Sequence, residues 1–183
     1  LSLRVVMRIA EAQGLQVVDV EQLPTHGGSL RVYAQPSSTG TRQVQQSVST
    51  ILDLESSFGI TSIDYYSGFQ ARTDKVKDDL VRFLYNAKSS SKLVVGYGAA
   101  AKGNTLLNYA GIKCDLLPAV ADRAASKQGC FLPGSHIQII SPEELYERSP
   151  DELLVLPWNL INELRKQLPD KRLVTAIPQL HRL

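Results

Sequence analysis

The sequence predicts an α/β protein whose C-terminal part is a Rossmann-like, three-layer domain with a parallel sheet. Two observations carry this prediction. From about residue 92 onward, short apolar runs alternate with helical patterns, which is typical of parallel strands joined by right-handed crossovers. The apolar runs are also nearly continuous, as expected for strands that are buried on both faces of a sheet.

The strands and helices of this domain are expected in a regular order. A first strand at 93–97 leads into a helix at 101–110, which Gly111 closes. Ser141 is the expected N-cap of a second helix, with Pro142 at its first position and Glu144 completing a capping box. In the strand order typical of such a unit, 3-2-1-4-5, the first and fourth strands are neighbours, and ligands bind beyond their carboxyl ends. The other strands are expected at 116–121, 137–140, 153–156 and 173–177, and the last helix at 159–168.

Two further segments precede this domain. An amphipathic helix is expected at 3–14, followed by a β-hairpin with strands at 16–23 and 29–34. Because an isolated two-stranded sheet is marginal in water, the hairpin is expected to belong to a larger sheet. Apolar residues at helical spacing then predict a helical connector. The expected division of the chain is 1–36, 37–91 and 92–183.

The most informative motif is the glycine turn after the first strand. Gly96-x-Gly98-x-x-Ala101 has the form of a dinucleotide-binding turn, followed by a helix. In such a turn the first glycine permits the tight bend, the second lets backbone N–H groups approach a phosphate, and a small third residue, here Ala101, lets helix and strand pack closely. The positive end of the helix dipole favours an anion there. Lys102 adds a full positive charge, and Asn104 could cap the helix. A phosphate-bearing ligand is therefore expected, although a single motif of this kind does not identify it.

The other wall of the expected crevice follows the fourth strand. Trp158, the only tryptophan, either stacks on a base or sugar or caps the core. Asp122 ends the second strand where a Rossmann acid would bind the ribose of NAD, but Arg123 stands directly beside it. The candidate substrate-binding residues are Gly96, Tyr97, Gly98, Ala99, Ala101, Lys102, Gly103, Asn104, Thr105, Asp122, Pro157, Trp158 and Asn159.

Composition sets bounds on the class of protein. The 183 residues carry 20 basic and 18 acidic side chains, a net charge of +2 that gives no argument for nucleic acid or a membrane surface. No apolar run approaches the roughly 20 residues that span a bilayer. Cys114 and Cys130 have neither metal-ligand spacing nor the density of a disulfide scaffold, so free thiols, no metal site and a cytoplasmic location are expected. The sequence has neither a signal peptide nor an initiator Met, which favours a piece of a longer protein.

Four motifs in order resemble the C-terminal region of S-adenosylmethionine-dependent C-methyltransferases, a family whose best-known members methylate nucleotide-linked deoxysugars. Together they extend over nearly the whole chain. The motifs are Leu23-Pro24-Thr25-His26-Gly27-Gly28 with the strand after it, Gly96-Tyr97-Gly98 with the helix start to Thr105, Leu132-Pro133-Gly134-Ser135-His136-Ile137, and Leu156-Pro157-Trp158-Asn159.

The resemblance implies a larger enzyme. A zinc-binding segment and a class I methyltransferase domain would precede this sequence, and the helix and hairpin of 1–36 would be the last elements of that domain. The full enzyme would remove a proton next to a sugar keto group and methylate the resulting carbanion or enolate. S-adenosylmethionine and zinc would bind outside this fragment, which by itself is expected to be inactive. The glycine turn would hold a nucleotide-diphosphate sugar, and His26 is a possible site residue.

Two alternatives stay open at this point. The chain could be a fragment of an NAD(P)-binding oxidoreductase, or a non-catalytic docking domain. In the hairpin, Arg31 is expected to pair with Glu21 rather than with a phosphate. His136 lies at the amino end of its strand, and a structural role or a subunit contact is expected for it. The sequence predicts neither the sugar, nor the base, nor the oligomeric state.

Overall fold

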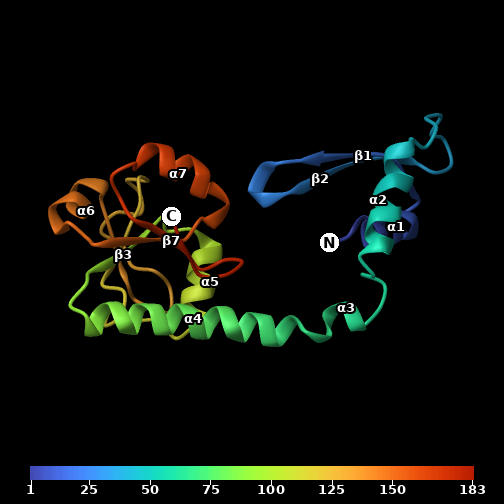
Figure 1. Cartoon of the computed structure of the whole chain (residues 1–183). Coiled ribbons are helices and arrows are strands. Elements are labelled where there is room, and N and C mark those ends of the chain that lie inside the picture. Colours follow the sequence, from blue (N-terminus) through green and yellow to red (C-terminus); the bar gives the residue numbers. More distant parts are fainter. The chain divides into compact units, whose positions relative to one another are not determined.

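A computed structural model of the chain describes residues 1–183, apart from the side chain of His26. The chain forms two compact units, Leu1–Phe69 and Gln70–Leu183 (Figure 1). No helix among the described residues is both long enough and apolar enough to cross a membrane. The division into three domains that the sequence suggests stays a prediction.

The N-terminal unit is built on the predicted hairpin. Strands β1 (Leu15–Leu23) and β2 (Ser29–Pro36) pair antiparallel, with Leu15 opposite Pro36 and Leu23 opposite Ser29. The predicted pair Arg31–Glu21 is present across the hairpin at 3.1 Å. The 3₁₀ turn η1 (Thr25–Gly27) joins the strands, and helices α1 (Leu3–Ala12), α2 (Gln46–Ser57) and α3 (Asp64–Ser67) complete the unit.

A small core holds α1 and α2 against the hairpin. Its buried side chains are Leu3, Val17, Val20, Val48 and Ile51. The Glu55 carboxylate of α2 accepts hydrogen bonds from the Leu3 and Arg4 N–H groups, at 2.5 and 3.1 Å. An acidic group at a helix N-terminus satisfies free N–H groups and interacts favourably with the helix dipole. The sheet of this unit has two strands only.

The C-terminal unit contains a six-stranded sheet in the order β5-β4-β3-β6-β7-β8. The first five of these strands are parallel and reproduce the predicted order 3-2-1-4-5, so the Rossmann-like fold is confirmed. The last strand pairs antiparallel with β7 and was not predicted. The elements are α4 (Phe69–Ser89), β3 (Val94–Tyr97), α5 (Ala101–Tyr109), β4 (Ala119–Ala121), β5 (Gln138–Ile140), α6 (Pro142–Arg148), β6 (Glu152–Val155), η2 (Trp158–Leu160), α7 (Ile161–Gln167), β7 (Leu173–Thr175) and β8 (His181–Arg182).

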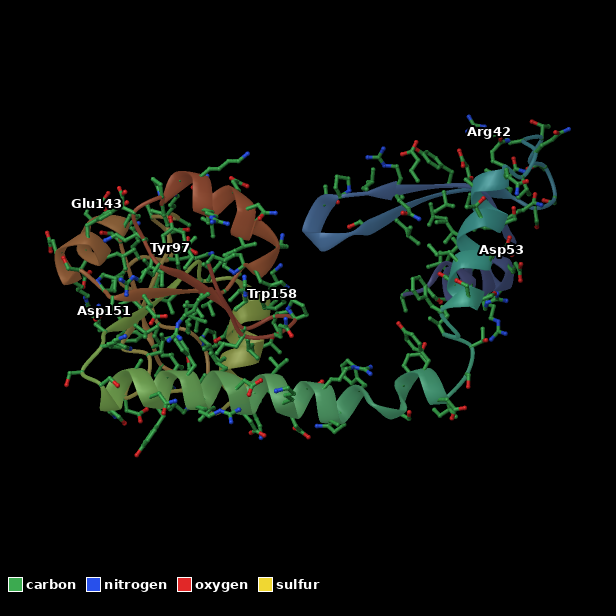
Figure 2. All side chains as sticks on the ribbon, in the orientation of Figure 1. Arg42, Asp53, Tyr97, Glu143, Asp151 and Trp158 are labelled. Carbon is green, nitrogen blue, oxygen red and sulfur yellow. The ribbon has the colours of Figure 1, made fainter. Side chains whose placement is uncertain are left out.

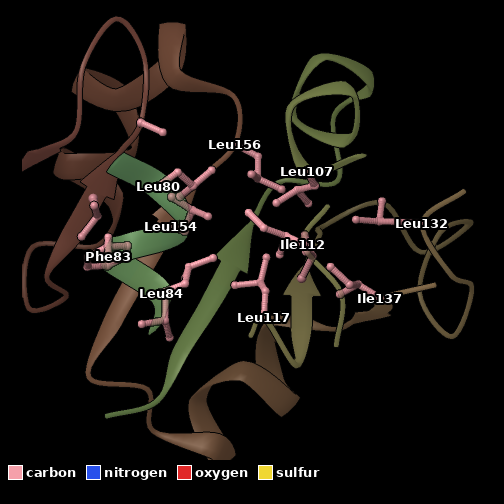
Figure 3. Close-up of a cluster of buried hydrophobic side chains, with 14 of the residues drawn as sticks. Leu80, Phe83, Leu84, Leu107, Ile112, Leu117, Leu132, Ile137, Leu154 and Leu156 are labelled. Carbon is pink, nitrogen blue, oxygen red and sulfur yellow. The ribbon is translucent and has the colours of Figure 1, made fainter. Parts of the chain in front are cut away.

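Helices cover both faces of this sheet and give the three predicted layers. Helices α4 and α5 pack on one face, where Leu80, Leu84 and Leu107 meet the strand residues Val120 and Leu154 (Figure 3). Helices α6 and α7 pack on the other face through Leu145 and Leu164. Successive residues of β3 and β6 alternate between these two clusters, so each strand is buried on both sides, as its continuous apolar run predicts.

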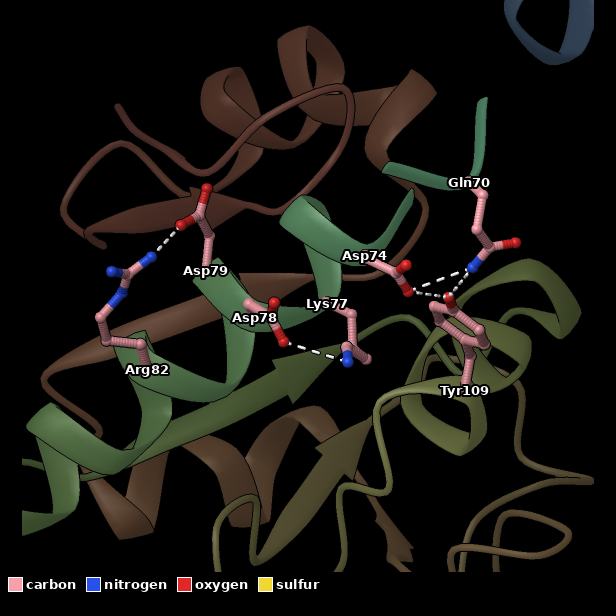
Figure 4. A network of polar contacts seen from close by, with 7 residues as sticks. All are labelled: Gln70, Asp74, Lys77, Asp78, Asp79, Arg82 and Tyr109. Atoms are coloured by element: carbon pink, nitrogen blue, oxygen red, sulfur yellow. Dashed lines mark hydrogen bonds and ion pairs between the residues drawn. The ribbon is translucent and has the colours of Figure 1, made fainter. Parts of the chain in front are cut away.

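Polar contacts along α4 support its packing against α5 (Figure 4). The Asp74 carboxylate accepts hydrogen bonds from the Tyr109 hydroxyl at 2.6 Å and from the Gln70 amide at 3.1 Å. The bond from Tyr109 lowers the pKa of Asp74 below its ordinary value, and the same bond raises the pKa of Tyr109. The contact ties the C-terminal end of α5 to α4, which helps to fix the helix that follows the glycine turn.

Local predictions hold in part. The Ser141 hydroxyl caps α6 by accepting from the Glu144 N–H at 3.2 Å, as expected. The reciprocal half of the capping box was wrong, because the Glu144 carboxylate accepts from Arg148 instead, at 2.6 Å. The strand expected at 116–121 is confined to β4, and the helix expected at 159–168 begins with the 3₁₀ turn η2. Leu160 in that turn is 41% exposed and does not belong to the apolar stripe of α7.

Candidate functional site

A cavity of about 290 Å³ lies at the carboxyl ends of β3, β4 and β6. This is the switch point of the sheet, because the connections from β3 and β6 leave toward opposite edges, and Rossmann-like domains bind ligands there. Its floor and walls are mostly apolar, and its rim is charged. The lining residues are Tyr97, Gly98, Ala100, Asp122, Arg123, Lys127, Pro157, Leu160, Glu163, Leu164 and Gln167.

The glycines of the turn have packing roles that differ from the predicted ones. Gly96 lies within β3, where a Cβ would stand 2.7 Å from a methyl group of Val120. Gly98, with φ +84°, makes the turn, and its Cβ would stand 2.6 Å from the Pro157 ring. Ala101 was expected to let helix and strand approach, but it is exposed. Gly103 takes that role, since a Cβ there would stand 2.5 Å from the Leu156 side chain.

The N–H groups of the turn itself are used within the protein. Gly98 donates to the Ala121 carbonyl at 2.7 Å, and Ala100 donates to the Gly98 carbonyl at 2.8 Å. Ala99 donates to the Asp122 carboxylate at 2.7 Å. Helix α5 follows with no side chain capping its N-terminus, so its first-turn N–H groups, from Ala101 onward, have no side-chain partner. The N–H groups without a side-chain partner therefore begin at Ala101, after the turn, and not within the turn as the motif predicts.

Two other predictions for α5 are decided by its contacts. Asn104 does not cap the helix, because its side-chain oxygen accepts from the Asn108 amide at 3.2 Å. Thr105 is exposed and its hydroxyl bonds back to the Ala101 carbonyl at 3.1 Å. Both side chains are therefore engaged with their own helix.

Asp122 ends β4 as expected, but its carboxylate faces the glycine turn. It accepts from the Ala124 N–H at 2.8 Å, from the Ala99 N–H at 2.7 Å and from the Lys127 ammonium at 3.1 Å. Burial of the carboxylate, which is 13% exposed, raises its pKa, but these three hydrogen bonds outweigh burial and lower the pKa of Asp122 below its ordinary value. Asp122 thus links the end of β4 to the glycine turn through hydrogen bonds.

Three predicted residues form a contact of their own. The Lys102 ammonium donates to the side-chain oxygen of Asn159 and lies 4.8 Å from the centroid of the Trp158 ring. Trp158 is half-buried where η2 begins, whereas Tyr97 is buried at the end of β3 (Figure 2). The prediction that the β3–α5 and β6–α7 connections lie side by side is confirmed by these contacts. The sequence did not reveal that the Lys102 cation would cover a face of the indole.

Several cavity residues were not predicted from the sequence. Glu163, Leu164 and Gln167 reach the cavity from α7, and the Gln167 amide donates to the Glu163 carboxylate at 3.1 Å. The spacing of these residues, i, i+1 and i+4, was a signal for one shared helix face. Lys127 and Arg123, from the loop after β4, had no comparable signal beyond their closeness to Asp122.

Comparison with known proteins agrees with the four motifs. Residues 24–178 match the family model described as the C-methyltransferase C-terminal domain. The chain belongs to this family. It is 36% identical over 154 residues to the C-methyltransferase NovU of Streptomyces niveus. That match covers 84% of this chain and 36% of the relative, so the chain spans little more than a third of the relative's length.

Cys114 and Cys130 are free and exposed, as predicted. Among the side chains that the structure describes, no group of three His, Cys, Asp or Glu residues could hold a metal ion. His26, the possible site residue of the hairpin loop, has a side chain outside the described residues. His136 is exposed at the amino end of β5.

Proposed function

We propose that this chain is the substrate-side portion of an S-adenosylmethionine-dependent C-methyltransferase that acts on a nucleotide-linked keto-deoxysugar. The cavity between the β3–α5 turn and the β6–α7 connection would hold the nucleotide diphosphate. One observation carries the proposal: in a member of the C-methyltransferase C-terminal domain family, the cavity lies at the switch point of a Rossmann-like sheet, and Gly98 and Ala100, directly before α5, line it.

The walls of the cavity suit the two halves of such a ligand. Ala100 lines the cavity directly before α5, and the uncapped first turn that follows it offers N–H donors for phosphate oxygens. Pro157, Leu160 and Leu164 offer an apolar wall for a base or a sugar ring. A ligand of this kind would be bound by groups that the fold has already placed.

The same residues supply binding rather than proton transfer. Asp122 is the carboxylate nearest the glycine turn, and a carboxylate that holds three hydrogen bonds with a lowered pKa is a poor proton acceptor. We assign removal of the proton next to the keto group to the methyltransferase domain of the family, as the resemblance implies, and not to Asp122. S-adenosylmethionine supplies the methyl group there, and zinc belongs to the segment that would precede it. This fragment alone is expected to be inactive.

The N-terminal unit fits the end of a larger methyltransferase sheet. Its sheet has two strands only, which pack against α1 and α2. A hollow of about 570 Å³ lies over α1 and the hairpin and is lined largely by apolar residues, among them Val6, Leu23, Leu30 and Val32. An unfilled apolar surface of this kind is expected where further strands of a parent sheet would pack.

The contacts of Asp122 argue against the NAD(P) alternative. A dinucleotide-binding domain uses the acid at this position to bind ribose hydroxyls. Here the Ala99 N–H, the Ala124 N–H and Lys127 already occupy three of the carboxylate's acceptor positions. Binding of a ribose diol to Asp122 would require at least one of these three hydrogen bonds to break.

Binding of nucleotides to the full chain tests the proposal. Thymidine diphosphate, NADH and S-adenosylmethionine are titrated in parallel, followed by the fluorescence of Trp158 and by calorimetry. We expect saturable binding of thymidine diphosphate alone, with a signal because Trp158 directly follows Pro157, which lines the cavity. Binding of NADH instead would favour the oxidoreductase, and no binding of any of the three would favour a docking role.

A further inference from the structure

Arg123 differs from the other cations around the cavity in having no partner. It lies directly after Asp122 at the end of β4, lines the cavity and is exposed. Among the side chains that the structure describes, none forms a hydrogen bond or ion pair with it. Lys127 is bound to Asp122 and to the Ala99 carbonyl, at 3.1 and 3.0 Å, and Lys102 is bound to Asn159.

The backbone that carries Arg123 is nevertheless held in place. The bond from the Ala124 N–H to the Asp122 carboxylate, 2.8 Å long, closes a turn around Arg123. The Asp122 N–H donates to the Ile140 carbonyl at 3.1 Å, and its carbonyl accepts from the Gln128 amide at 3.0 Å. The position of the Arg123 Cα is thus fixed before any ligand binds, which reduces the entropic cost of using its side chain.

Of the two cationic side chains that line the cavity, Arg123 is the one that is not already in an ion pair. Asp122 and Lys127 neutralise each other in an ion pair. Glu163 also lines the cavity, but it accepts from Gln167 and forms no ion pair with Arg123 among the described contacts. A guanidinium offers a planar set of donors that matches two phosphate oxygens at once.

We infer that Arg123 is the side chain that binds the diphosphate of the ligand, and that Lys102 is a positioning residue for Trp158 and Asn159. The assignment rests on the proposed function, because it names the group of that same cavity that recognises the anion. It replaces the expectation, drawn from the glycine motif, that Lys102 meets the phosphate.

The test compares a charged and an uncharged ligand on the full chain. Calorimetry measures the affinities of thymidine diphosphate and of thymidine for the wild type and for Arg123→Gln, Lys102→Gln and Arg165→Gln. Arg165 is an exposed arginine of α7 that does not line the cavity, so its variant is the matched control for loss of one charge. Circular dichroism on each variant establishes that it is folded.

We expect Arg123→Gln to weaken thymidine diphosphate about tenfold or more, as for loss of a charge-assisted hydrogen bond, while thymidine changes less than about twofold. The salt dependence of diphosphate binding should also become shallower in this variant. Lys102→Gln should weaken both ligands to a similar extent, and Arg165→Gln should change neither.

Three other results would count against the assignment of Arg123 or against the proposed function. If the wild type binds thymidine diphosphate and Arg123→Gln binds it equally well, the assignment of Arg123 is overturned while the proposed function stands. Loss of the preference for the diphosphate in Lys102→Gln would overturn the assignment in the same way. If the wild type binds no thymidine diphosphate at all, the proposed function and the role of Arg123 both fail.

Discussion

Replacement of Gly98 by alanine would show how closely the glycine turn packs against the end of β6. A left-handed φ such as +84° costs an L-residue about 1–2 kcal/mol. The new methyl carbon would also stand 2.6 and 2.7 Å from two ring carbons of Pro157, well inside the roughly 3.5–4 Å of a favourable carbon–carbon contact. Overpacking of this kind costs about 1–3 kcal/mol. We therefore expect Gly98→Ala to lower the free energy of unfolding by about 2–5 kcal/mol.

Two further variants separate these contributions. Gly111 has φ +66° and no neighbouring atom within 4 Å of the place a Cβ would take, so Gly111→Ala carries the backbone cost alone, about 1–2 kcal/mol. Pro157→Ala removes both ring carbons that the new methyl would meet. In that background, Gly98→Ala should cost no more than Gly111→Ala. The double-mutant cycle should thus give a coupling energy of about 1–3 kcal/mol.

Urea unfolding followed by Trp158 fluorescence is the suitable assay. Trp158 is the only tryptophan and lies in the C-terminal unit, so the signal reports on the unit that contains both substitutions. A coupling energy below about 0.5 kcal/mol would be within the range of independent sites and would refute the close approach of Gly98 to Pro157.

Three further predictions concern the same unit. Gly103→Ala should destabilise by up to about 2 kcal/mol although alanine favours helices by about 1 kcal/mol, because overpacking against Leu156, 2.5 Å from the added methyl group, costs about 1–3 kcal/mol; a stabilised variant in urea unfolding would contradict this. Arg182→Gln should cost about 1–3 kcal/mol by the same assay, because it leaves Glu152, 4% exposed, without its two bonds of 2.9 and 3.2 Å. Arg148→Gln is its control and should cost about 0.5 kcal/mol or less, because its partner Glu144 is 40% exposed, whereas Glu152 is 4% exposed. The lowered pKa of Asp122 stabilises the fold above the ordinary carboxyl pKa, and this stability is lost as the pH falls through the lowered value. Asp122→Asn should therefore be less stable than the wild type at pH 7 and should lose less stability on acidification. Parallel profiles of unfolding free energy against pH would contradict this.

The sheet could be predicted because each strand is marked by a pattern of neighbouring residues in the sequence. Each strand is a short apolar run between helical patterns, and chirality then restricts the strand order to few choices. The N-cap of α6 is equally local, since Ser141 and Glu144 are three residues apart. Strand β8 escaped prediction because its two residues are too few for a pattern, and its place depends on the distant partner of Arg182, Glu152.

The candidate site was predicted in location but not in detail. The strand order was enough to bring Lys102 and Asn159 together. Whether a backbone N–H is free depends on tertiary partners, so the bond from Ala99 to Asp122 could not be read from the motif. Glu163 and Gln167 resemble the solvated face of any surface helix, and only the fold shows that this face lines a cavity.

The packing of the glycine turn also determines which residues can report on a ligand. Gly96, Gly98 and Gly103 each stand where an added methyl group would meet a neighbouring side chain within 2.7 Å. A descendant that no longer bound any nucleotide would still lose stability if it lost these glycines. Loss of function in such a lineage would appear first at positions that the fold does not require. By this reasoning Arg123, exposed and unpartnered, is a better marker of a working site than the glycine pattern that first draws attention to it.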